Sequence, residues 1–439
     1  MERMRFAWII GALAVLMVTG CGKKMQDDDT PITLKLWTHE DPNRQRLEEG
    51  YATAYMAAHP NVTIEYSVYP SGRIQDLIST AYASRNAPSI WNLELQKAYP
   101  LLAQGICAPL DPAAIGARTE TEIIDMYLEH MLDPVVDAKG ELGPRGKIYG
   151  LSLELNNWCM YLNKKIFRDA GLDPETEYPK TWEDVMAVSE RIVRRTGNTI
   201  IRRGFDFRYP DYLISWVPMV NQLGGRVVSD DGTEAITNLD AWTRVLEYMQ
   251  EFGPNGKNLG SPTYKRPRTA FDTDSNEIAL SLSGLYQEAR IATVNPDFYT
   301  SGEWMVIPYP VFVGGLDLAG CYYFQYYMVN SQIPEREQRE AWRFISFMLS
   351  HPEDYLNEVA LVQPRRSLIE SDAYKNMPYS GVFLDDLARA EPVYYGAASW
   401  QINQLINEAI EEVMLNNVSP RTAAEKLKRS AQRVLDETE

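Results

Sequence analysis

Polar and aromatic side chains gather at the ends of three predicted strands. They are Trp37, Thr38, His39, Glu40 and Asp41 at the first, Asn92 and Glu94 at the second, and Asn156, Asn157 and Trp158 at the third. Carboxylates and amides form hydrogen bonds with polar ligands, and flat aromatic rings bury apolar surface. A strand that packs only into a core would carry aliphatic residues here. These positions are therefore candidates for ligand binding or catalysis.

The acidic members of this set have competing interpretations. Glu40, Asp41, Glu94 and Glu154 would supply the two carboxylates of a glycoside hydrolase, which leave no sequence signature. His39 beside Glu40 and Asp41 suggests a metal, but consecutive strand residues point to opposite faces and no second histidine lies at ligand spacing. Glu40 and Asp41 would equally cap the following helix.

The remaining polar residues also have simpler interpretations. Asn92 and Glu94 suit a solvated loop, and Asn156 with Asn157 suits a strand end followed by a turn. The sequence contains no Gly-x-Ser-x-Gly, Walker A, His-Glu-x-x-His or Gly-x-Gly-x-x-Gly motif. Motifs therefore give no support to an enzyme, and no cofactor is expected.

The elements that must position these residues alternate regularly. A strand over residues 32–38 precedes a helix over about 43–59, and a second strand precedes a helix over about 73–84 and a third strand ending at Glu94. This order predicts an α/β fold with a parallel sheet covered by helices on both faces. Ligands of such sheets bind beyond the carboxyl ends of the strands, where the polar residues lie.

The N-terminus predicts secretion and lipidation. Arg3 and Arg5 precede an apolar run over residues 6–18, as in a signal peptide over residues 1–20. The segment Val18-Thr19-Gly20-Cys21 resembles a bacterial lipobox, which implies a lipid on Cys21. An ordinary signal peptide with a chance cysteine is the alternative. Residues 21–31 are polar and predict a flexible tether.

Charge and cysteine content exclude some classes of protein. The chain has 439 residues and a formal net charge of −17, and removal of residues 1–20 leaves 419 residues and −18. This acidic balance disfavours a nucleic-acid partner, which requires a basic surface. Besides Cys21 the chain has Cys107, Cys159 and Cys321, for which buried free thiols and one long-range disulfide are the alternatives.

The order of motifs along the chain resembles that of extracellular solute-binding proteins of the maltose-binding-protein type, the receptors of ABC importers. The resemblance covers nearly the whole mature chain and rests on Leu36-Trp37, Gly146, Tyr149-Gly150, Asn163-Lys164, Phe167, Ala170-Gly171-Leu172, Thr181-Trp182-Glu183, Gly224-Gly225, residues 363–367 and the last two helices. Gly284-Leu285-Tyr286 stands where the family has Gly-x-Trp.

The resemblance implies a periplasmic-binding-protein-like fold, in which two α/β lobes joined by a multi-strand hinge enclose a ligand cleft. Mapped onto this chain, lobe one comprises residues 31–149 plus 307–331. Lobe two comprises residues 150–306 plus 332–439. The segment Asn156-Asn157-Trp158 then faces the cleft from the hinge.

The family's ligands imply a carbohydrate, and an oligosaccharide is expected here, with hydroxyl edges for amides and carboxylates and C–H faces for aromatic rings. The expected stacking residues are Trp37, Trp158, Tyr286, Tyr323 and Trp400, with Tyr212 and Trp216 as further candidates. Core packing is the alternative for each aromatic residue, and it is the expectation for Trp182, Trp242 and Trp342. Of Arg365 and Arg366, one is expected to reach the ligand, and Arg365 is taken as the candidate.

The same resemblance implies the partners and the location. We expect a monomer that delivers its sugar to two permease subunits, has no enzymatic activity and is anchored in the cell membrane through Cys21. It would face the extracellular side, or the periplasm of a Gram-negative cell. A secreted carbohydrate-active enzyme and a sugar receptor that signals to a sensor kinase without transport are the alternatives.

Overall fold

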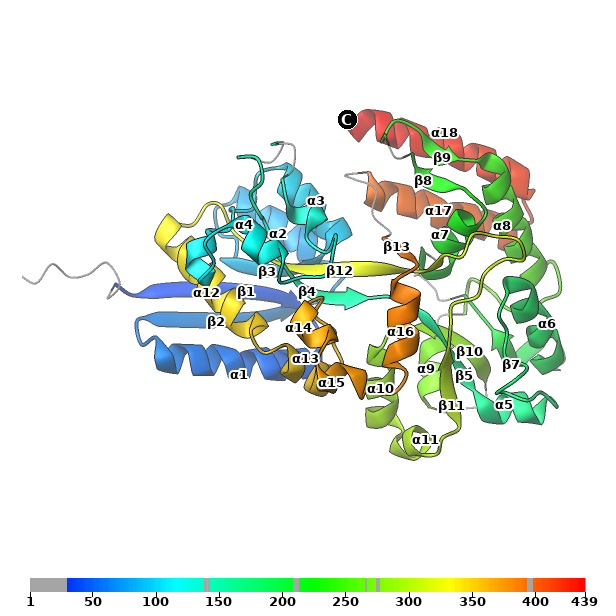
Figure 1. Cartoon of the computed structure of the whole chain (residues 1–439). Coiled ribbons are helices and arrows are strands. Elements are labelled where there is room, and N and C mark those ends of the chain that lie inside the picture. The colour runs from blue at the N-terminus through cyan, green and yellow to red at the C-terminus, as the bar shows by residue number, and fades with distance from the viewer. Residues whose placement is uncertain are drawn as a thin grey trace, which may run out of the picture.

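The computed structural model describes residues 30–137, 140, 143–207, 213–229, 231–264, 267–273, 277–392 and 398–438, with side chains except at 321–323 and 392. Cys21 and Tyr212 lie outside these residues, as does the side chain of Tyr323. Two lobes, each built on its own sheet, lie side by side (Figure 1).

The first sheet has the strand order β13-β12-β3-β1-β2, with β4 also paired to β12. Its strands are β1 (Ile32–His39), β2 (Val62–Tyr69), β3 (Ile90–Glu94), β4 (Leu151–Asn156), β12 (Ala319–Val329) and β13 (Ala390–Pro392). The strand β1 pairs in parallel with β2 and β3, as the strand–helix alternation predicts, whereas β12 runs antiparallel to β3 and β4. The carboxyl ends of β1 and β3 therefore meet at one edge.

Helices cover both faces of this sheet. They are α1 (Pro42–Ala58), α2 (Ile74–Ala83), α3 (Leu95–Ala103), α4 (Glu120–Ile124), α12 (Glu335–Leu349) and α13 (Pro352–Val359), with 3₁₀ turns at Pro112–Ile115 and Asp133–Val135. In Figure 1, α1 lies below the strands and α2 and α3 lie above them. The alternating burial of Ile32, Leu34 and Leu36 in β1 follows the two-residue period of the strand.

The second sheet has the order β11-β5-β10-β7-β6. Its strands are β5 (Cys159–Asn163), β6 (Arg194–Thr196), β7 (Thr199–Phe205), β10 (Ile278–Ser283) and β11 (Trp304–Ile307), and a separate hairpin joins β8 (Arg226–Val228) to β9 (Ala235–Thr237). Side chains of β5 alternate between two cores. Met160 and Leu162 enter one core, and Cys159 and Tyr161 enter the other, so both faces of the sheet are covered.

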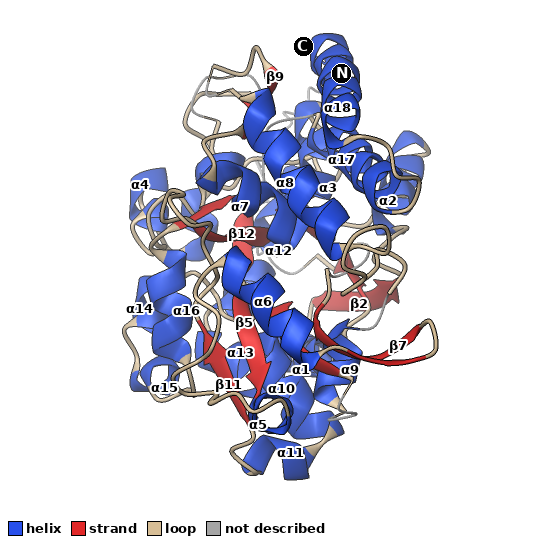
Figure 2. Ribbon diagram, turned by 90° about the vertical axis from the view of Figure 1, so that its right-hand side faces the viewer, coloured by secondary structure: helices blue, strands red, loops and turns tan. Residues whose placement is uncertain are grey.

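The helices of the second lobe divide between these two cores. They are α5 (Lys164–Asp169), α6 (Trp182–Ile192), α7 (Leu213–Gln222), α8 (Leu239–Phe252), α9 (Pro267–Asp272), α10 (Tyr286–Val294), α11 (Pro296–Thr300), α14 (Arg366–Ile369), α15 (Asp372–Lys375), α16 (Ser380–Leu387), α17 (Ser399–Met414) and α18 (Pro420–Thr438). In Figures 1 and 2, α18 lies against α17 and α8 at one end of the lobe. No helix within the described ranges combines the length and the apolar character needed to cross a membrane.

The packing of α12 and α13 differs from the predicted lobe boundaries. Trp342, Phe344, Met348 and Tyr355 lie in the core of the first sheet, although the sequence analysis assigned residues 332–439 to lobe two. The chain returns to the first lobe through β12, and the apolar face of α12 covers that sheet before the chain crosses again near residue 362, where the amide of Leu155 donates to the Val362 carbonyl.

The crossing strands require close packing at the hinge. The strand β4 ends at Asn156 in the first sheet and β5 begins at Cys159 in the second. A β-carbon at Gly320, near the start of β12, would lie 2.8 Å from both the Trp158 carbonyl oxygen and the Tyr309 ring. Only glycine lets the two crossing segments approach this closely.

Several other expectations are confirmed. Trp182, Trp242 and Trp342 are buried in the cores, and Cys107 and Cys159 are buried free thiols. The mixed α/β architecture with two sheets is the predicted fold class.

The two lobes should respond separately to core truncation. We expect Trp342→Ala to cost about 3–5 kcal/mol through lost burial and a residual cavity, and to accelerate amide hydrogen exchange in β1, β2 and β3. Trp182→Ala is the matched change in the other lobe and should accelerate exchange in β5 and β7. Loosening of the second sheet by Trp342→Ala would contradict the assignment of α12 to the first lobe.

Candidate functional site

A cavity of about 1070 Å³ lies between the two lobes. The first lobe contributes the turn from β1 into α1 and the start of α3, and the second contributes α9, α10 and α17. Seven of the predicted site residues line it: His39, Glu40, Asp41, Glu94, Trp158, Tyr286 and Trp400. Residues that lie more than 350 positions apart in the sequence therefore meet at one site.

The other predicted residues lie elsewhere. Thr38, Asn92, Asn156 and Asn157 are buried behind the cavity wall, Trp37 packs against Tyr69 at 4.6 Å between ring centroids, and Arg365 lies 5.2 Å from the centroid of the Tyr127 ring. Trp216 was expected as a candidate for stacking on the ligand, but it is fully buried against Trp242 in the core of the second lobe. The face of α7 that carries it packs inward, so it supports the fold rather than a ligand.

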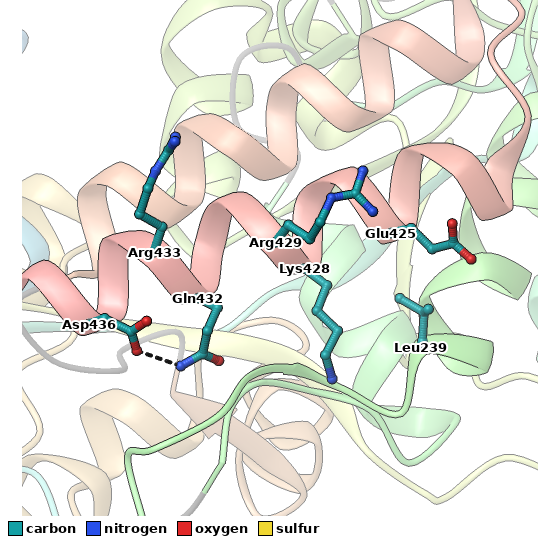
Figure 3. A pocket seen from close by; sticks show the side chains of 7 residues that line it. All are labelled: Leu239, Glu425, Lys428, Arg429, Gln432, Arg433 and Asp436. Carbon is teal, nitrogen blue, oxygen red and sulfur yellow. Dashed lines mark hydrogen bonds between the residues drawn. The ribbon is translucent and has the colours of Figure 1, made fainter.

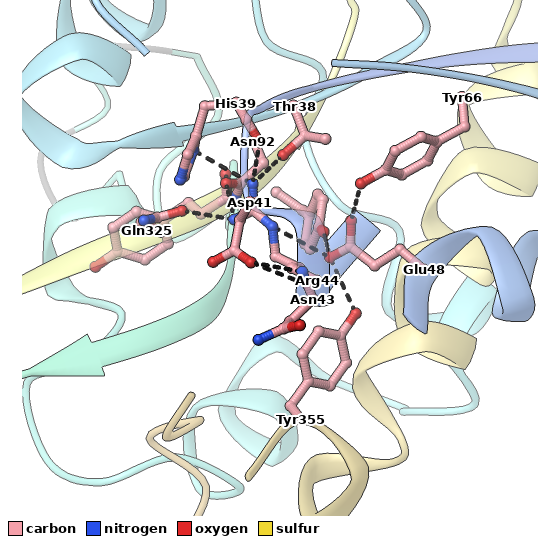
Figure 4. A network of polar contacts seen from close by, with 12 residues as sticks. Thr38, His39, Asp41, Asn43, Arg44, Glu48, Tyr66, Asn92, Gln325 and Tyr355 are labelled. Carbon is pink, nitrogen blue, oxygen red and sulfur yellow. Dashed lines mark hydrogen bonds and ion pairs between the residues drawn. The ribbon is translucent and has the colours of Figure 1, made fainter. Parts of the chain in front are cut away.

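The floor of the cavity is built around one buried arginine. Arg44, in the first turn of α1, donates from Nη1 to Asn92 Oδ1 and to Gln325 Oε1, each at 3.1 Å, and from Nη2 to Thr38 and to the His39 carbonyl (Figure 4). These partners belong to β3, β12 and β1. One guanidinium therefore links three strands of the first sheet, which explains why Thr38 and Asn92 lie behind the wall.

The charge of Arg44 is matched within the same helix. Glu48 lies one turn later, with Oε1 3.9 Å from Arg44 Nε, and it accepts hydrogen bonds from Tyr66 at 2.7 Å, Tyr355 at 3.2 Å and Tyr327. Burial raises the pKa of Glu48, whereas Arg44 and the tyrosines oppose that rise. Three hydroxyl donors and one cation thus compensate a carboxyl group that has no access to water.

Two polar groups on the first-lobe rim have environments that fix their roles. Burial and the charges of Arg44 and Lys97 lower the pKa of His39 to about 2, so its ring is neutral. Asp41 accepts hydrogen bonds from the backbone amides of Asn43 and Arg44 at 3.1 Å, which makes it the N-cap of α1. Glu40 is exposed at the same rim and lines the cavity.

A buried carboxyl group lines the cavity at the hinge. Glu154 in β4 accepts a hydrogen bond from the Asn156 side chain, and burial raises its pKa to about 7 although Arg44 lowers it. Asn157 donates to the Phe383 carbonyl of α16 at 2.7 Å. The two asparagines therefore form hydrogen bonds with protein groups where the chain crosses between the lobes. Neither asparagine lines the cavity.

Aromatic rings form part of the second-lobe wall. Trp158 and Tyr286 meet edge to face, with their centroids 5.8 Å apart. A β-carbon at Gly284 would lie 2.8 Å from Asn156 Oδ1 and 2.9 Å from the Tyr286 ring, so glycine is required to seat this ring. Trp400 lies in the first turn of α17 and is 47% exposed, in contrast to Trp158 at 6%.

Sequence reasoning missed several residues of the cavity wall. They are Arg44, Lys97, Arg268, Arg290, Gln325, Asn403, Gln404, Asn407, Glu408 and Glu411. A signal for the α17 members was present, because Trp400, Gln404, Asn407 and Glu411 recur at helical spacing opposite the apolar face. Arg44 had no such signal, since an arginine in the first turn of a helix normally faces solvent.

A second, open hollow follows the outer face of α18. Leu239 and six α18 side chains line it, including Lys428, Arg429 and Arg433, and Figure 3 shows these side chains spread along the helix. They come almost entirely from one helix and do not converge on a common point. The interlobe cavity is therefore the candidate site.

The buried pair on α1 should be strongly coupled. We expect Arg44→Met to cost about 3–5 kcal/mol because it leaves Glu48 buried without its cation. The double variant Arg44→Met with Glu48→Gln should recover part of that loss, measured by chemical unfolding as a double-mutant cycle. Arg46→Met, at an exposed position on the same helix, is the control. The Glu48→Gln single variant completes the cycle, and a double-variant loss equal to the sum of the two single losses would exclude the coupling.

The carboxyl of Glu154 should make stability depend on pH. Its pKa of about 7 exceeds the ordinary 4.5, so the folded state holds a proton that the unfolded state has released. Stability therefore falls as pH rises across this window. We expect Glu154→Gln to gain about 3 kcal/mol relative to the parent between about pH 4 and pH 8. Comparing the two proteins at each pH cancels the contributions of the other titrating groups, and a stability difference that stays constant with pH would contradict the prediction.

The comparisons with known proteins agree with this architecture. Residues 41–354 match a family described as bacterial extracellular solute-binding protein. An arabinooligosaccharide-binding protein of Halalkalibacterium halodurans is 24% identical over 264 residues, which are 57% of this chain and 53% of the relative. The chain thus spans about half the length of that curated relative.

Solved structures share the fold at low sequence identity. The GacH receptor of Streptomyces glaucescens, studied unliganded and with acarbose, has a TM-score of 0.77 at 17% identity and covers 93% of this chain and 99% of its own. The maltose/maltodextrin-binding domain of Bdellovibrio bacteriovorus, bound to maltotriose, has a TM-score of 0.76 at 15% identity and covers 92% and 100%. The matched family model spans both lobes and the crossing strands between them, so the chain belongs to the bacterial extracellular solute-binding proteins.

Proposed function

We propose that this protein captures an oligosaccharide in the interlobe cavity and delivers it to the two permease subunits of an ABC importer. The observation that carries the proposal is the lining of the cavity. Carboxylates and amides stand beside the rings of Trp158, Tyr286 and Trp400, which suits hydroxyl edges and C–H faces of sugar rings. No covalent chemistry is required of these residues.

The size of the cavity favours more than one sugar unit. Small-molecule sites usually enclose about 300–1,000 Å³, and this cavity reaches about 1070 Å³. The named ligands of similar proteins include arabinooligosaccharide and maltotriose. An oligosaccharide of a few units is the ligand that fits both considerations.

Each lobe supplies half of the site, so ligand binding favours closure. The described structure has one direct hydrogen bond between α3 and α17, from Asn403 Nδ2 to Gln96 Oε1 at 2.9 Å. A ligand that contacts α17 and the β1–α1 turn together would add many more contacts across the gap. The closed surface is then the form that the permease subunits recognise.

The location follows from the N-terminus. We propose that the protein is a monomer held at the outer face of the cell membrane by a lipid on Cys21, with residues 21–31 as the tether. Mass spectrometry of the intact membrane-extracted protein would show a diacylglyceryl mass on Cys21, and its absence would reject the anchor while leaving the sugar site untouched.

Ligand binding should be measured on the soluble form that begins at residue 22. We expect a matching oligosaccharide at 100 times its Kd to add about 2.7 kcal/mol of stability and to change tryptophan fluorescence, with the sugar recovered intact. The panel should include neutral oligosaccharides, sugar acids, polyols and peptides. Cleavage of the sugar would favour a hydrolase, and a response to peptides alone would reject the carbohydrate proposal.

The ring of Trp400 should contribute to affinity rather than to folding. Because it is 47% exposed, we expect Trp400→Ala to change unfolding stability by less than about 0.5 kcal/mol and to weaken sugar binding about 10- to 100-fold through lost apolar contact. Leu415→Ala is the control, since Leu415 is 40% exposed and follows the same helix outside the cavity. Equal affinities of the two variants would contradict the stacking role.

A further inference from the structure

We infer that the cavity selects oligosaccharides that carry a carboxylate, such as uronic-acid oligomers, and that Arg268 binds that carboxylate. This inference rests on the proposed function and names the substrate class of the same site. It depends on how the positive charges around the cavity are compensated.

Arg268 lies near the start of α9, half-buried in the second-lobe wall. Its guanidinium carbon is 5.6 Å from the centroid of the Tyr286 ring, and Nη1 donates to the Tyr286 hydroxyl at 3.4 Å. Among the described residues, no carboxylate lies within 4.0 Å of its nitrogens. The charge is thus held against an aromatic ring without an anion.

The other cations that line the cavity each have a carboxylate in their own lobe. Arg44 faces Glu48, and Lys97 lies 3.2 Å from Glu94. Arg290 donates to Asp272 Oδ2 from Nη2 at 2.8 Å and from Nε at 3.1 Å. Asp272 is itself fully buried and also accepts a hydrogen bond from Gln287. Within the described part of the chain, Arg268 is the one cavity-lining arginine or lysine without a carboxylate partner.

Closure of the lobes would raise the free-energy cost of leaving Arg268 without an anion. When the cavity loses water, a cation without an anionic partner loses its hydration and forms no ion pair in its place. A ligand carboxylate would restore the balance, and a guanidinium can bind it through two parallel hydrogen bonds. The adjoining rings of Tyr286 and Trp158 would contact the sugar ring that bears the carboxylate.

The opposite wall favours one orientation of such a ligand. Glu40 and Asp41 lie on the first-lobe rim of the cavity, where they would repel a carboxylate and accept hydrogen bonds from hydroxyl groups. The second-lobe wall also carries the α17 carboxylates Glu408 and Glu411, so the acidic end of the sugar is directed to Arg268 on α9 and away from α17. The ligand presents hydroxyl groups to one lobe and its carboxylate to the other.

The test compares sugars that differ only in charge. Trimers of galacturonate and of glucuronate are titrated against the soluble protein by calorimetry, each beside its methyl ester, together with neutral malto-, manno- and arabino-oligosaccharides. We expect at least one acid to bind about 10- to 100-fold more tightly than its ester. Arg268→Gln should abolish that preference, and Arg268→Lys should retain part of it.

Arg433→Gln, an identical change at an exposed position on α18, is the matched control and should keep the preference. Unfolding of each unliganded variant is followed to confirm that it folds. Tight binding of a neutral sugar without preference for an acid would overturn the inference and leave the proposed function standing. An acid preference that survives Arg268→Gln would overturn the role of Arg268. A panel in which no sugar binds would reject both.

Discussion

The geometry of the cavity depends on one guanidinium buried beneath it. Arg44 holds β1, β3 and β12 together through Thr38, Asn92 and Gln325. Gln325 follows Arg44 by 281 residues, on the strand that returns from the second lobe. Fixing that strand to the first sheet fixes where the hinge begins. Glu48 and three tyrosine hydroxyls are required because a buried cation without partners would destabilise the fold.

The same requirement for satisfied polar groups explains the odd composition of the segment between β4 and β5. A chain that leaves one sheet for another exposes backbone groups that no ladder pairs. Asn157 binds the Phe383 carbonyl, and Asn156 binds Glu154. Trp158 then covers the crossing from the cavity side. The asparagines therefore stabilise the hinge, and of the three residues only the tryptophan lines the site.

Strands and helices that follow from the local spacing of apolar residues could be predicted from the sequence. Residue roles that depend on tertiary contacts could not. Strand–helix alternation was sufficient for the parallel strands β1 to β3, and motif order was sufficient for the two-lobe fold. Trp158 and Trp216 are the same residue type, yet one lines the cavity and the other is core, because only packing decides which face of α7 turns inward. The buried position of Arg44 could not be predicted for the same reason. The lobe assignment of α12 failed because an amphipathic helix does not identify the sheet it covers.

The distribution of ion pairs around the cavity allows the lobes to move without separating paired charges. Around the cavity, Arg44 pairs with Glu48 and Lys97 with Glu94 inside the first lobe, and Arg290 pairs with Asp272 inside the second. Opening or closing therefore breaks none of them. The link from α3 to α17 is a neutral hydrogen bond between Gln96 and Asn403, worth about 1 kcal/mol. The contacts of a ligand that spans the cavity would outnumber this single hydrogen bond.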